Sequence, residues 1–445
     1  MRLTIQVETA LQSETLPATR APWSPISRVA FRFCSIYFTL YCLGTQIINS
    51  VLTVPKVEVP DWGTIWPVRP AIFWVAAHLF GAKTPLVFSD SGSGDKTYDW
   101  VLMFCLFVLA VAATTIWSFL DQNRTSYSSL FKWFWLFLRV CLASQMLSYG
   151  FAKVFPLQMS FPYLFTQVEP FGNFSPMGIL WASIGASPAY ETFAGCAECL
   201  GGILILIPRT TTLGALICLL DMVQVFALNM TYDIPVKLFS FHLILVSVFL
   251  LAPDFRRLLN VLVLNRFAEP SVREPLFATP RANRWAAGAI ALICIWMIAC
   301  NLIGVWDGWH QYGPVSAKSP LYGIWDIEQL TIDGQTHPLL ITDKENWRRL
   351  IFDFPESVMV MQMNDTRTGY SVVIDPAKNT LTLTGRSDKN WRATFVYQRP
   401  APDTLILDGT LDGHREHLQL RRLDHTKFQF SSRGFHWIQE YPFNR

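Results

Sequence analysis

The sequence predicts a polytopic α-helical membrane protein of about seven spans, followed by a C-terminal all-β domain. Of its 445 residues, 51% are hydrophobic and only 16% are charged, whereas soluble globular chains are roughly 25% charged. Seven apolar windows are long enough to cross about 30 Å of hydrocarbon as helix. From about residue 320 onward the pattern changes to short alternating segments separated by turn signals, which is typical of antiparallel strands.

Composition also excludes some classes of partner and site. The net charge of +3 is too small for a nucleic-acid-binding surface, which concentrates Lys and Arg on one domain. All nine cysteines lie in apolar runs before residue 301, so no disulfide framework is expected in the β-rich part. The first 27 residues lack an apolar core of signal-peptide length, so we expect no cleavage there.

The apolar windows divide the chain into five expected parts. The windows cover residues 30–53, 98–120, 133–152, 188–207, 211–230, 236–253 and 285–306. The parts are a cytoplasmic segment (1–27), two transmembrane helices with an extracytoplasmic interfacial loop (28–132), a four-helix core (133–260), a cytoplasmic loop with the last helix (261–306) and an extracytoplasmic β-rich domain (307–445). With the N-terminus in the cytoplasm, the inside segments hold thirteen Lys or Arg and the outside loops hold six, so the positive-inside rule favours this orientation in the plasma membrane.

Two outside loops are more than short connections. One contains the aromatic run "WPVRPAIFWVAAHLFG" (66–81), and the other, residues 154–187, is rich in Pro, Phe and Gly. Both patterns indicate interfacial covers on the outer leaflet. The stretch "SGSGD" (91–95) could form an anion-binding nest, but a turn before the next span is the simpler interpretation.

The β-rich part contains about eight alternating segments, of which "KFQFSS" (427–432) is expected to be the last. Gly323 and Trp325 open this series and resemble the start of a lipocalin-like barrel. One helix is expected to interrupt it, "DKENWRRLIFDF" (343–354), with Thr342 or Asp343 as N-cap. His414, His417 and His425 are expected to be solvated barrel positions, and no metal site is expected, because no Cys or suitably spaced carboxylate accompanies them.

Ionisable residues in the spans indicate where a functional site would lie, because such residues are costly in lipid. They are absent from the interiors of spans 1, 2 and 7. Spans 3 to 6 hold Arg139, Glu198, Asp221 and His242 inside and Lys153, Glu191, Asp233 and Lys237 at their outer ends. At a rise of about 1.5 Å per residue, Arg139 lies roughly 9 Å and Glu198 and Asp221 lie roughly 15 Å into their helices. A structural ion pair would explain two of these groups. Their larger number, and their positions at different depths in the membrane, favour a function.

Two local motifs have competing interpretations. In "NMTYDIPVKLFSFH" (229–242), Asp233 is expected to cap span 6 and to pair with Lys237, which leaves His242 as the residue without a structural role. "GCAECLGG" (195–202) places Cys196 and Cys199 around Glu198. The pair could be a redox dithiol, or the small residues could serve close helix packing.

Residues 133–260 resemble the four-helix core of DoxX-like membrane proteins. The resemblance rests on Tyr149, Gly150, Lys153, Glu198 with Gly201 and Gly202, Arg209, and the segment Tyr232-Asp233-x-Pro-x-Lys237. It implies a link to thiosulfate:quinone oxidoreductases or to thiol-redox and oxidative-stress assemblies. Because the chain has no haem, flavin or iron–sulfur motif, electrons would have to come from a redox partner protein or from the pair of Cys196 and Cys199.

Three functions therefore compete. In the first, the chain is a component of a quinone- or thiol-linked membrane redox system in the lipid bilayer, and quinone is the expected cofactor. Protons would be moved or balanced by Arg139, Glu198 and Asp221, the quinone oxygens would meet His242 or Lys153, and the ring would be bound near Tyr149, Tyr232, Asp233 and Lys237. The second is a small-solute or proton carrier, although no inverted repeat is visible. The third is a non-enzymatic envelope-assembly protein.

Overall fold

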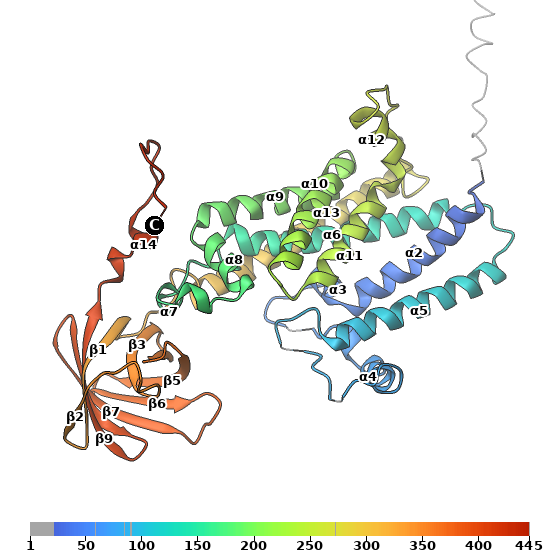
Figure 1. Ribbon diagram of the computed structural model, residues 1–445. Coiled ribbons are helices and arrows are strands. Elements are labelled where there is room, and N and C mark those ends of the chain that lie inside the picture. The colour runs from blue at the N-terminus through green and yellow to red at the C-terminus, as the bar shows by residue number, and fades with distance from the viewer. Residues whose placement is uncertain (1–21, 58, 84, 90, 272, 445) are drawn as a thin grey trace, which may run out of the picture. The chain divides into compact units, whose positions relative to one another are not determined.

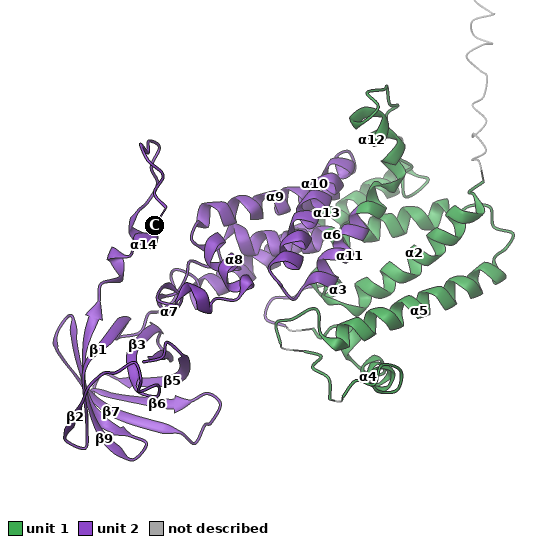
Figure 2. Ribbon diagram, viewed as in Figure 1, with its two compact units in different colours: residues 1–52, 58–142, 248–293 green, residues 53–57, 143–247, 294–445 purple. Residues whose placement is uncertain are grey.

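A computed structural model describes residues 22–57, 59–83, 85–89, 91–271 and 273–444 of the chain (Figure 1). The predicted cytoplasmic segment 1–27 therefore lies largely outside the described residues. The chain divides into two compact units, residues 1–52, 58–142 and 248–293, and residues 53–57, 143–247 and 294–445 (Figure 2). Three of the five boundaries between the units fall inside helices: α6 (Ser128–Val154), α11 (Lys237–Leu251) and α13 (Pro280–Gln311).

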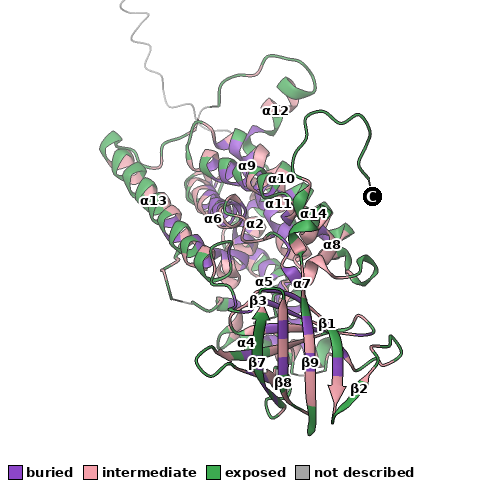
Figure 3. Cartoon of the chain, turned by 90° about the vertical axis from the view of Figure 1, so that its left-hand side faces the viewer, coloured by how far each residue is buried: buried purple, intermediate pink, exposed green. Residues whose placement is uncertain are grey.

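Seven helices in the described part of the chain are long and apolar enough to cross a membrane. They are α2 (Pro25–Gly44), α5 (Thr97–Leu120), α6 (Ser128–Val154), α9 (Pro188–Leu206), α10 (Thr211–Thr231), α11 (Lys237–Leu251) continued by α12 (Phe255–Leu262), and α13 (Pro280–Gln311). The seven predicted spans are confirmed, and the protein is a membrane protein. The helices differ in how far they are buried (Figure 3). In an 18-residue apolar window of α6, 61% of the residues are buried, whereas in the corresponding window of α13 only 17% are buried.

Shorter helices occupy the two loops that were predicted to be interfacial. They are α4 (Val68–Leu79), α7 (Leu164–Gln167) and α8 (Pro176–Gly185), whereas α3 (Gln46–Val51) lies at the end of the predicted first span, 30–53. The aromatic run 66–81 contains α4. Residues 91–95 form no helix or strand and lead into α5, whose N-cap is Lys96.

The first unit contains a buried cation near the start of α2. The Arg32 side chain is 4% exposed, and its guanidinium donates to the Tyr127 hydroxyl, to Ser118 Oγ and to the Asp121 carbonyl, each at 2.8 Å. Asp121 follows the C-terminus of α5, where the helix dipole favours a positive charge. No ionisable group was expected in the interior of span 1. Arg32 is an exception, and it is explained by this structural role.

The C-terminal domain is a closed antiparallel barrel (Figure 1). Its strands are β1 (Gly323–Ile332), β2 (Gln335–His337), β3 (Trp347–Phe354), β4 (Ser357–Gln362), β5 (Arg367–Asp375), β6 (Thr380–Gly385), β7 (Arg392–Ala401), β8 (Thr404–Leu411) and β9 (His414–Leu423). The short β2 extends β1 as a hairpin, and the other eight strands pair in order and close through β1 and β9. The predicted all-β domain is thus confirmed.

Large apolar side chains fill the interior of the barrel. Trp325, Leu350, Phe352 and Phe395 are at most 1% exposed and belong to one continuous core. The Trp325 indole N–H donates to the Leu321 carbonyl at 2.8 Å, so its polar edge is satisfied as well.

Two secondary-structure predictions in this domain were wrong. Residues 347–354 form strand β3 instead of the second half of a helix, and Thr342 and Asp343 cap nothing. β3 lies between β1 and β4, and these pairings outweigh a local sequence pattern that suits a helix equally well. The expected last strand, 427–432, is instead the short helix α14 (Gln429–Ser432) with the turn before it, because β1 already pairs with β9 and closes the barrel.

The segment between α6 and α9 (residues 155–187, called the α6–α9 segment below) packs against the outside of the barrel. Leu164 is buried against Ile324 and Ile351. The Asp353 carboxylate accepts from the backbone N–H groups of Leu164 and Phe165 at 3.0 and 3.2 Å, which caps α7. Burial raises the pKa of Asp353 above its usual value, although these two hydrogen bonds act in the opposite direction.

Candidate functional site

Helices α6 and α9 approach closely because glycines face each other at their crossing. A Cβ atom on Gly150 would lie 2.6 Å from Cys199 Sγ, and one on Gly195 would lie 2.5 Å from the Val154 nitrogen. Gly201 makes a similar contact with Cys218 of α10. The packing interpretation of "GCAECLGG" is therefore supported: Cys199 is buried in the helix contact, whereas Cys196 is exposed.

This close approach brings together two charges that are 45 residues apart in the chain. The Lys153 ammonium donates to both oxygens of Glu198, at 2.7 and 2.8 Å. Both residues are buried, with exposed fractions of 8% and 3%. The ammonium also lies 5.7 Å from the centre of the Tyr149 ring. A buried pair of this geometry balances both charges and keeps the ammonium in place.

A cavity of about 110 Å³, called the core cavity below, lies beside this ion pair. Its lining combines apolar side chains with a few polar groups, which is usual for a small-molecule site. The lining residues come from α6, the α6–α9 segment, α9, α10 and α11 together with the turn before it: Tyr149, Lys153, Gln158, Met159, Leu180, Trp181, Ile184, Tyr190, Glu191, Ala194, Glu198, Met222, Gln224, Val225, Leu228, Asn229, Ile234, Val236, Phe239, Ser240 and Leu243. The size is of the same order as the cavity of about 150 Å³ that holds a benzene ring in an engineered protein. A single six-membered ring is therefore the largest group expected to enter without movement of the walls.

The core cavity reaches the surface of the helices. Tyr190 of α9 is 48% exposed, and Gln224 of α10 is also exposed, yet both residues line the cavity. These two helices are among those that cross the membrane. The lining of the core cavity thus extends to the outer surface of α9 and α10.

Three of the nine predicted site residues line the core cavity: Tyr149, Lys153 and Glu198. Glu191 lies seven residues before Glu198 on α9 and lines the same cavity, as expected for residues on one helix face. Asp221 is half-buried on α10 and is not among the lining residues. Among the described residues, its Oδ2 has no hydrogen-bond partner.

The segment 229–242 has a structural role, because its ionisable side chains bond to partners within the segment. Asp233 has φ +53° and its side chain is 87% exposed, so it forms the left-handed turn after α10. The predicted pairing with Lys237 is confirmed, at 2.9 Å. His242 has a structural partner after all, because its Nδ1 bonds the Leu238 carbonyl one turn earlier at 2.7 Å. Tyr232 is the residue that follows the last turn of α10.

Arg139 belongs to the first compact unit, not to the unit that contains the core cavity. It is 5% exposed, and its guanidinium lies 4.8 Å over the ring of Trp135. The guanidinium of Arg273 lies over the same ring at 4.0 Å. Arg273 in turn pairs with the buried carboxylate of Asp254. These contacts give Arg139 a packing role at this place.

Sequence reasoning missed several cavity residues, among them Gln158, Trp181, Asn229 and Ser240. Gln158 and Trp181 lie in the α6–α9 segment, where no helical period could align them with the spans. Glu191 was noted only as a charge at the end of a span. Its Oε1 accepts from the Met159 backbone N–H at 2.8 Å, so it also fixes the start of the α6–α9 segment.

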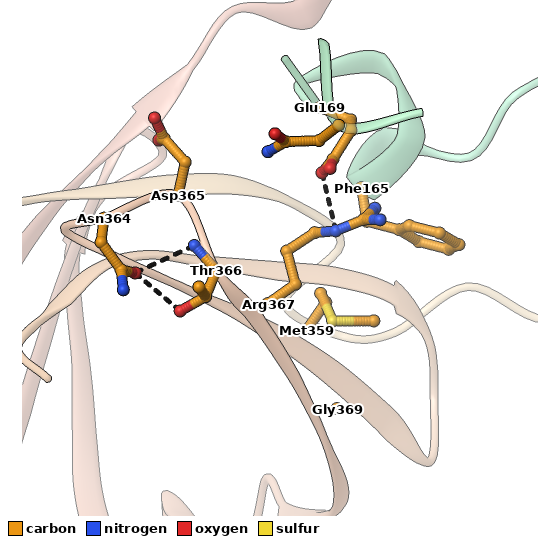
Figure 4. A pocket seen from close by; sticks show the side chains of 9 residues that line it. Phe165, Glu169, Met359, Asn364, Asp365, Thr366, Arg367 and Gly369 are labelled. Atoms are coloured by element: carbon orange, nitrogen blue, oxygen red, sulfur yellow. Dashed lines mark hydrogen bonds and ion pairs between the residues drawn. The ribbon is translucent and has the colours of Figure 1, made fainter. Parts of the chain in front are cut away.

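A second hollow, of about 560 Å³, lies between the α6–α9 segment and the turn that joins β4 to β5 (Figure 4). The Arg367 Nε lies 2.7 Å from Glu169 Oε2, and Asn364 Oδ1 accepts from the Thr366 nitrogen at 3.0 Å. The Arg367 guanidinium also lies 5.9 Å from the centre of the Phe165 ring. Glu169 and Arg367 pair with each other and tie the α6–α9 segment to the barrel, whereas Asp365 pairs with Arg348.

The histidines near the β8–β9 turn pair with carboxylates. His414 Nδ1 lies 2.7 Å from Asp333 Oδ2, and His417 Nδ1 lies 2.6 Å from Asp408 Oδ1. The pairing with Asp333 raises the pKa of His414 above its usual value. Among the described residues, no group of three or more His, Cys, Asp or Glu side chains could hold a metal ion. His425 stacks edge-on against Tyr322.

We expect the barrel to become less stable as the pH rises from about 4.5 to about 7, because of Glu416. Burial, with Asp412 and Asp333 nearby, raises the pKa of Glu416 from 4.5 to about 7, although His414 acts in the opposite direction. Between these two values the folded state binds the proton and the unfolded state does not, so stability falls with pH and the loss is complete above about 7. Hydrogen exchange of the β8–β9 peptides in the full chain should be slower in Glu416→Gln than in wild type at pH 8, and the difference should shrink at pH 5. An equal difference at both pH values would contradict this assignment.

Comparison with known proteins identifies one family. Over 123 residues the chain is 34% identical to a Bacillus subtilis (strain 168) protein described as "Uncharacterized protein YwoB", and the match covers 28% of this chain and 78% of that protein. The chain belongs to the YwoB family. No family model matches the chain, and no solved structure matches it. Because the description of YwoB names no activity, the function of this member of the YwoB family has to be argued from its site.

Proposed function

We propose that this protein is a component of a membrane redox system whose helical core binds the ring of a quinone. The observation that carries the proposal is the core cavity itself: a ring-sized, mostly apolar space beside the buried Lys153–Glu198 pair. An ion pair that served only to assemble helices would need no adjoining space. The lining that extends to the surface at Tyr190 and Gln224 suits a ligand that is dissolved in the bilayer.

Three further features support a quinone over other ligands and over thiol chemistry. The Lys153 ammonium and the Tyr149 ring lie where they can contact a carbonyl oxygen and a ring face. Cys199 is committed to the contact with Gly150, so the Cys196–Cys199 pair is not poised as an exposed dithiol. Electrons would come from a partner protein. The resemblance to DoxX-like proteins agrees with this assignment.

We further propose that the N-terminus is cytoplasmic and that the barrel lies outside the plasma membrane. The excess of Lys and Arg in the alternate loops supports this orientation. The barrel would then hold the α6–α9 segment, which supplies five lining residues of the core cavity: Gln158, Met159, Leu180, Trp181 and Ile184.

The proposal is tested by extracting lipids from the purified protein and measuring quinone by mass spectrometry. Wild type should carry about one quinone per chain. Ala194→Phe fills the core cavity and should lose the quinone, because the added side chain occupies most of the available volume. Ala189→Phe is the matched control, because Ala189 is exposed on the same helix and does not line the cavity.

Two outcomes would overturn the proposal. One is the absence of quinone from wild type above the level of the surrounding lipid. The other is equal retention by wild type, Ala189→Phe and Ala194→Phe, which would place the quinone outside the core cavity.

A further inference from the structure

The connection between α11 and α13 contains a folded loop, residues 254–271, called the α12 loop below. It belongs to the first compact unit (Figure 2). The carboxylate of Asp254 is buried and accepts from Arg257 at 2.8 Å and from Ser271 Oγ at 3.1 Å. Arg257 Nε also donates to the Glu269 carbonyl at 2.8 Å. These bonds join the two ends of the loop, so the side chains on its outer surface are held in a defined arrangement.

The α12 loop begins where the sixth span is long enough to have left the hydrocarbon. α11 begins at Lys237, and about 20 residues of helix cross the apolar core of a bilayer, so the boundary falls near Arg256. The short 3-10 helix Ala252–Asp254 separates α11 from α12 at this depth. Because α13 is the next span, we expect the α12 loop to lie at the membrane–water boundary.

Helix α12 has an apolar face that is only partly covered by the described part of the chain. Phe255, Leu258, Leu259 and Leu262 lie at positions i, i+3, i+4 and i+7, which is one face of a helix. Phe255 is 63% exposed and Leu262 is 67% exposed, and Phe267 beyond the helix is 85% exposed. Figure 3 shows α12 in the colours of exposed and intermediate residues. An apolar face of this kind at the end of a span is typical of a helix that lies in the headgroup region.

A surplus of cations accompanies this apolar face. Residues 252–285 contain six arginines and three acidic residues. Arg256 and Arg266 are exposed, and within the described residues their side chains have no hydrogen bond or ion pair. Arg281 and Arg284, in the first turns of α13, are exposed as well. These arginines are therefore available to an external anion.

The acidic residues of the same stretch cancel only part of this charge. Asp254 is already paired with two arginines, and Glu274 lies 3.7 Å from Lys132 Nζ. Glu269 is exposed and opposes one of the available cations. A soluble acidic protein would also match the remaining charge, but a loop that joins two spans meets lipid headgroups in every molecule. The position of the α12 loop thus favours an anionic lipid surface.

We propose that the α12 loop is a binding surface for anionic phospholipid headgroups, in which the apolar face of α12 enters the headgroup region while Arg256 and Arg266 bind lipid phosphates. The planar N–H fork of a guanidinium matches two phosphate oxygens at once. This surface is a second site of the protein, and the proposal does not depend on quinone binding.

The test measures hydrogen exchange of the peptides that cover residues 255–267 in the full-length protein. The protein is placed in nanodiscs of phosphatidylcholine alone and in nanodiscs with about one third of phosphatidylglycerol, an anionic lipid. Wild type should exchange more slowly in the anionic nanodiscs, by about fivefold for each bound arginine, because unfolding of α12 releases the arginines from the surface. Raising the salt concentration from about 0.1 to about 1 M should remove the difference, because it shortens the Debye length from about 10 to about 3 Å.

A pair of double variants assigns the effect to the loop. Arg256→Gln with Arg266→Gln should lose most of the difference between the two lipid compositions, and it should fold, because neither side chain has a partner among the described residues. Arg386→Gln with Arg392→Gln is the matched control. It removes the same charge from two exposed arginines of the C-terminal domain and should keep the full difference.

Three outcomes would overturn the proposal. The first is equal exchange of wild type in the two lipid compositions. The second is a lipid-dependent difference that persists in Arg256→Gln with Arg266→Gln or at high salt. The third is slow exchange only in nanodiscs that hold two copies of the chain, whatever the lipid, which would assign the surface to a second copy.

Discussion

Replacing Glu198 alone by Gln is expected to destabilise the helical core by about 3–5 kcal/mol, because it leaves the buried Lys153 ammonium without its counter-charge. The same variant should lose the bound quinone, since the ammonium is no longer held beside the core cavity. Thermal unfolding in detergent and quinone retention measure the two effects. The exposed pair of Asp233 and Lys237 provides the control, because Lys237→Met should change stability by at most about 1 kcal/mol.

A double variant separates structural from functional roles of this pair. Lys153→Met with Glu198→Leu removes both charges, and apolar replacements of a buried pair are often neutral for stability. We expect the double variant to recover most of the stability lost in Glu198→Gln but to bind no quinone. Full quinone retention by the double variant would show that the pair only assembles helices. Stability of Glu198→Gln equal to that of Lys237→Met would contradict the buried geometry.

Adding a single methyl group at Gly195 is expected to have the second-largest effect. The Cβ of Gly195→Ala would lie 2.5 Å from the Val154 nitrogen and 2.6 Å from the Gly150 carbonyl oxygen. Both are backbone atoms of α6, so the helices must move apart, at a typical cost of about 1–3 kcal/mol or more. The separation also pulls Lys153 away from Glu198, so quinone retention should fall together with the unfolding temperature.

The control for this substitution is Gly288→Ala in α13. A Cβ at Gly288 meets no atom within 4 Å, and alanine favours helix over glycine by about 1 kcal/mol. Gly288→Ala should therefore unfold at or slightly above the wild-type temperature. An unchanged unfolding temperature in Gly195→Ala would show that α6 and α9 do not depend on this contact.

The candidate site was predictable in part. Lys153 and Glu198 were identified because charged residues stand out in apolar helices, and Tyr149 was identified through the resemblance to DoxX-like proteins. His242 was given a site role because its partner could not be seen, whereas Asp233 was given one although its pairing with Lys237 was predicted. The partner of His242 is a backbone carbonyl, and Asp233 adopts a left-handed turn. Neither feature can be recognised from the types of the residues.

The sequence by itself determined the seven spans and the β-rich domain. A helix that crosses lipid needs a long apolar run, and a strand with one buried face has an apolar residue at every second position, so both patterns can be recognised in the sequence. It could not determine that residues 347–354 form a strand, since strand pairing is made with partners elsewhere in the chain. Nor could it reveal the core cavity, which depends on the close approach of α6 and α9 at Gly150 and Gly195 and on Gln158 and Trp181 from the α6–α9 segment. Only the tertiary structure decides such contacts, because they join residues far apart in sequence through packing in three dimensions.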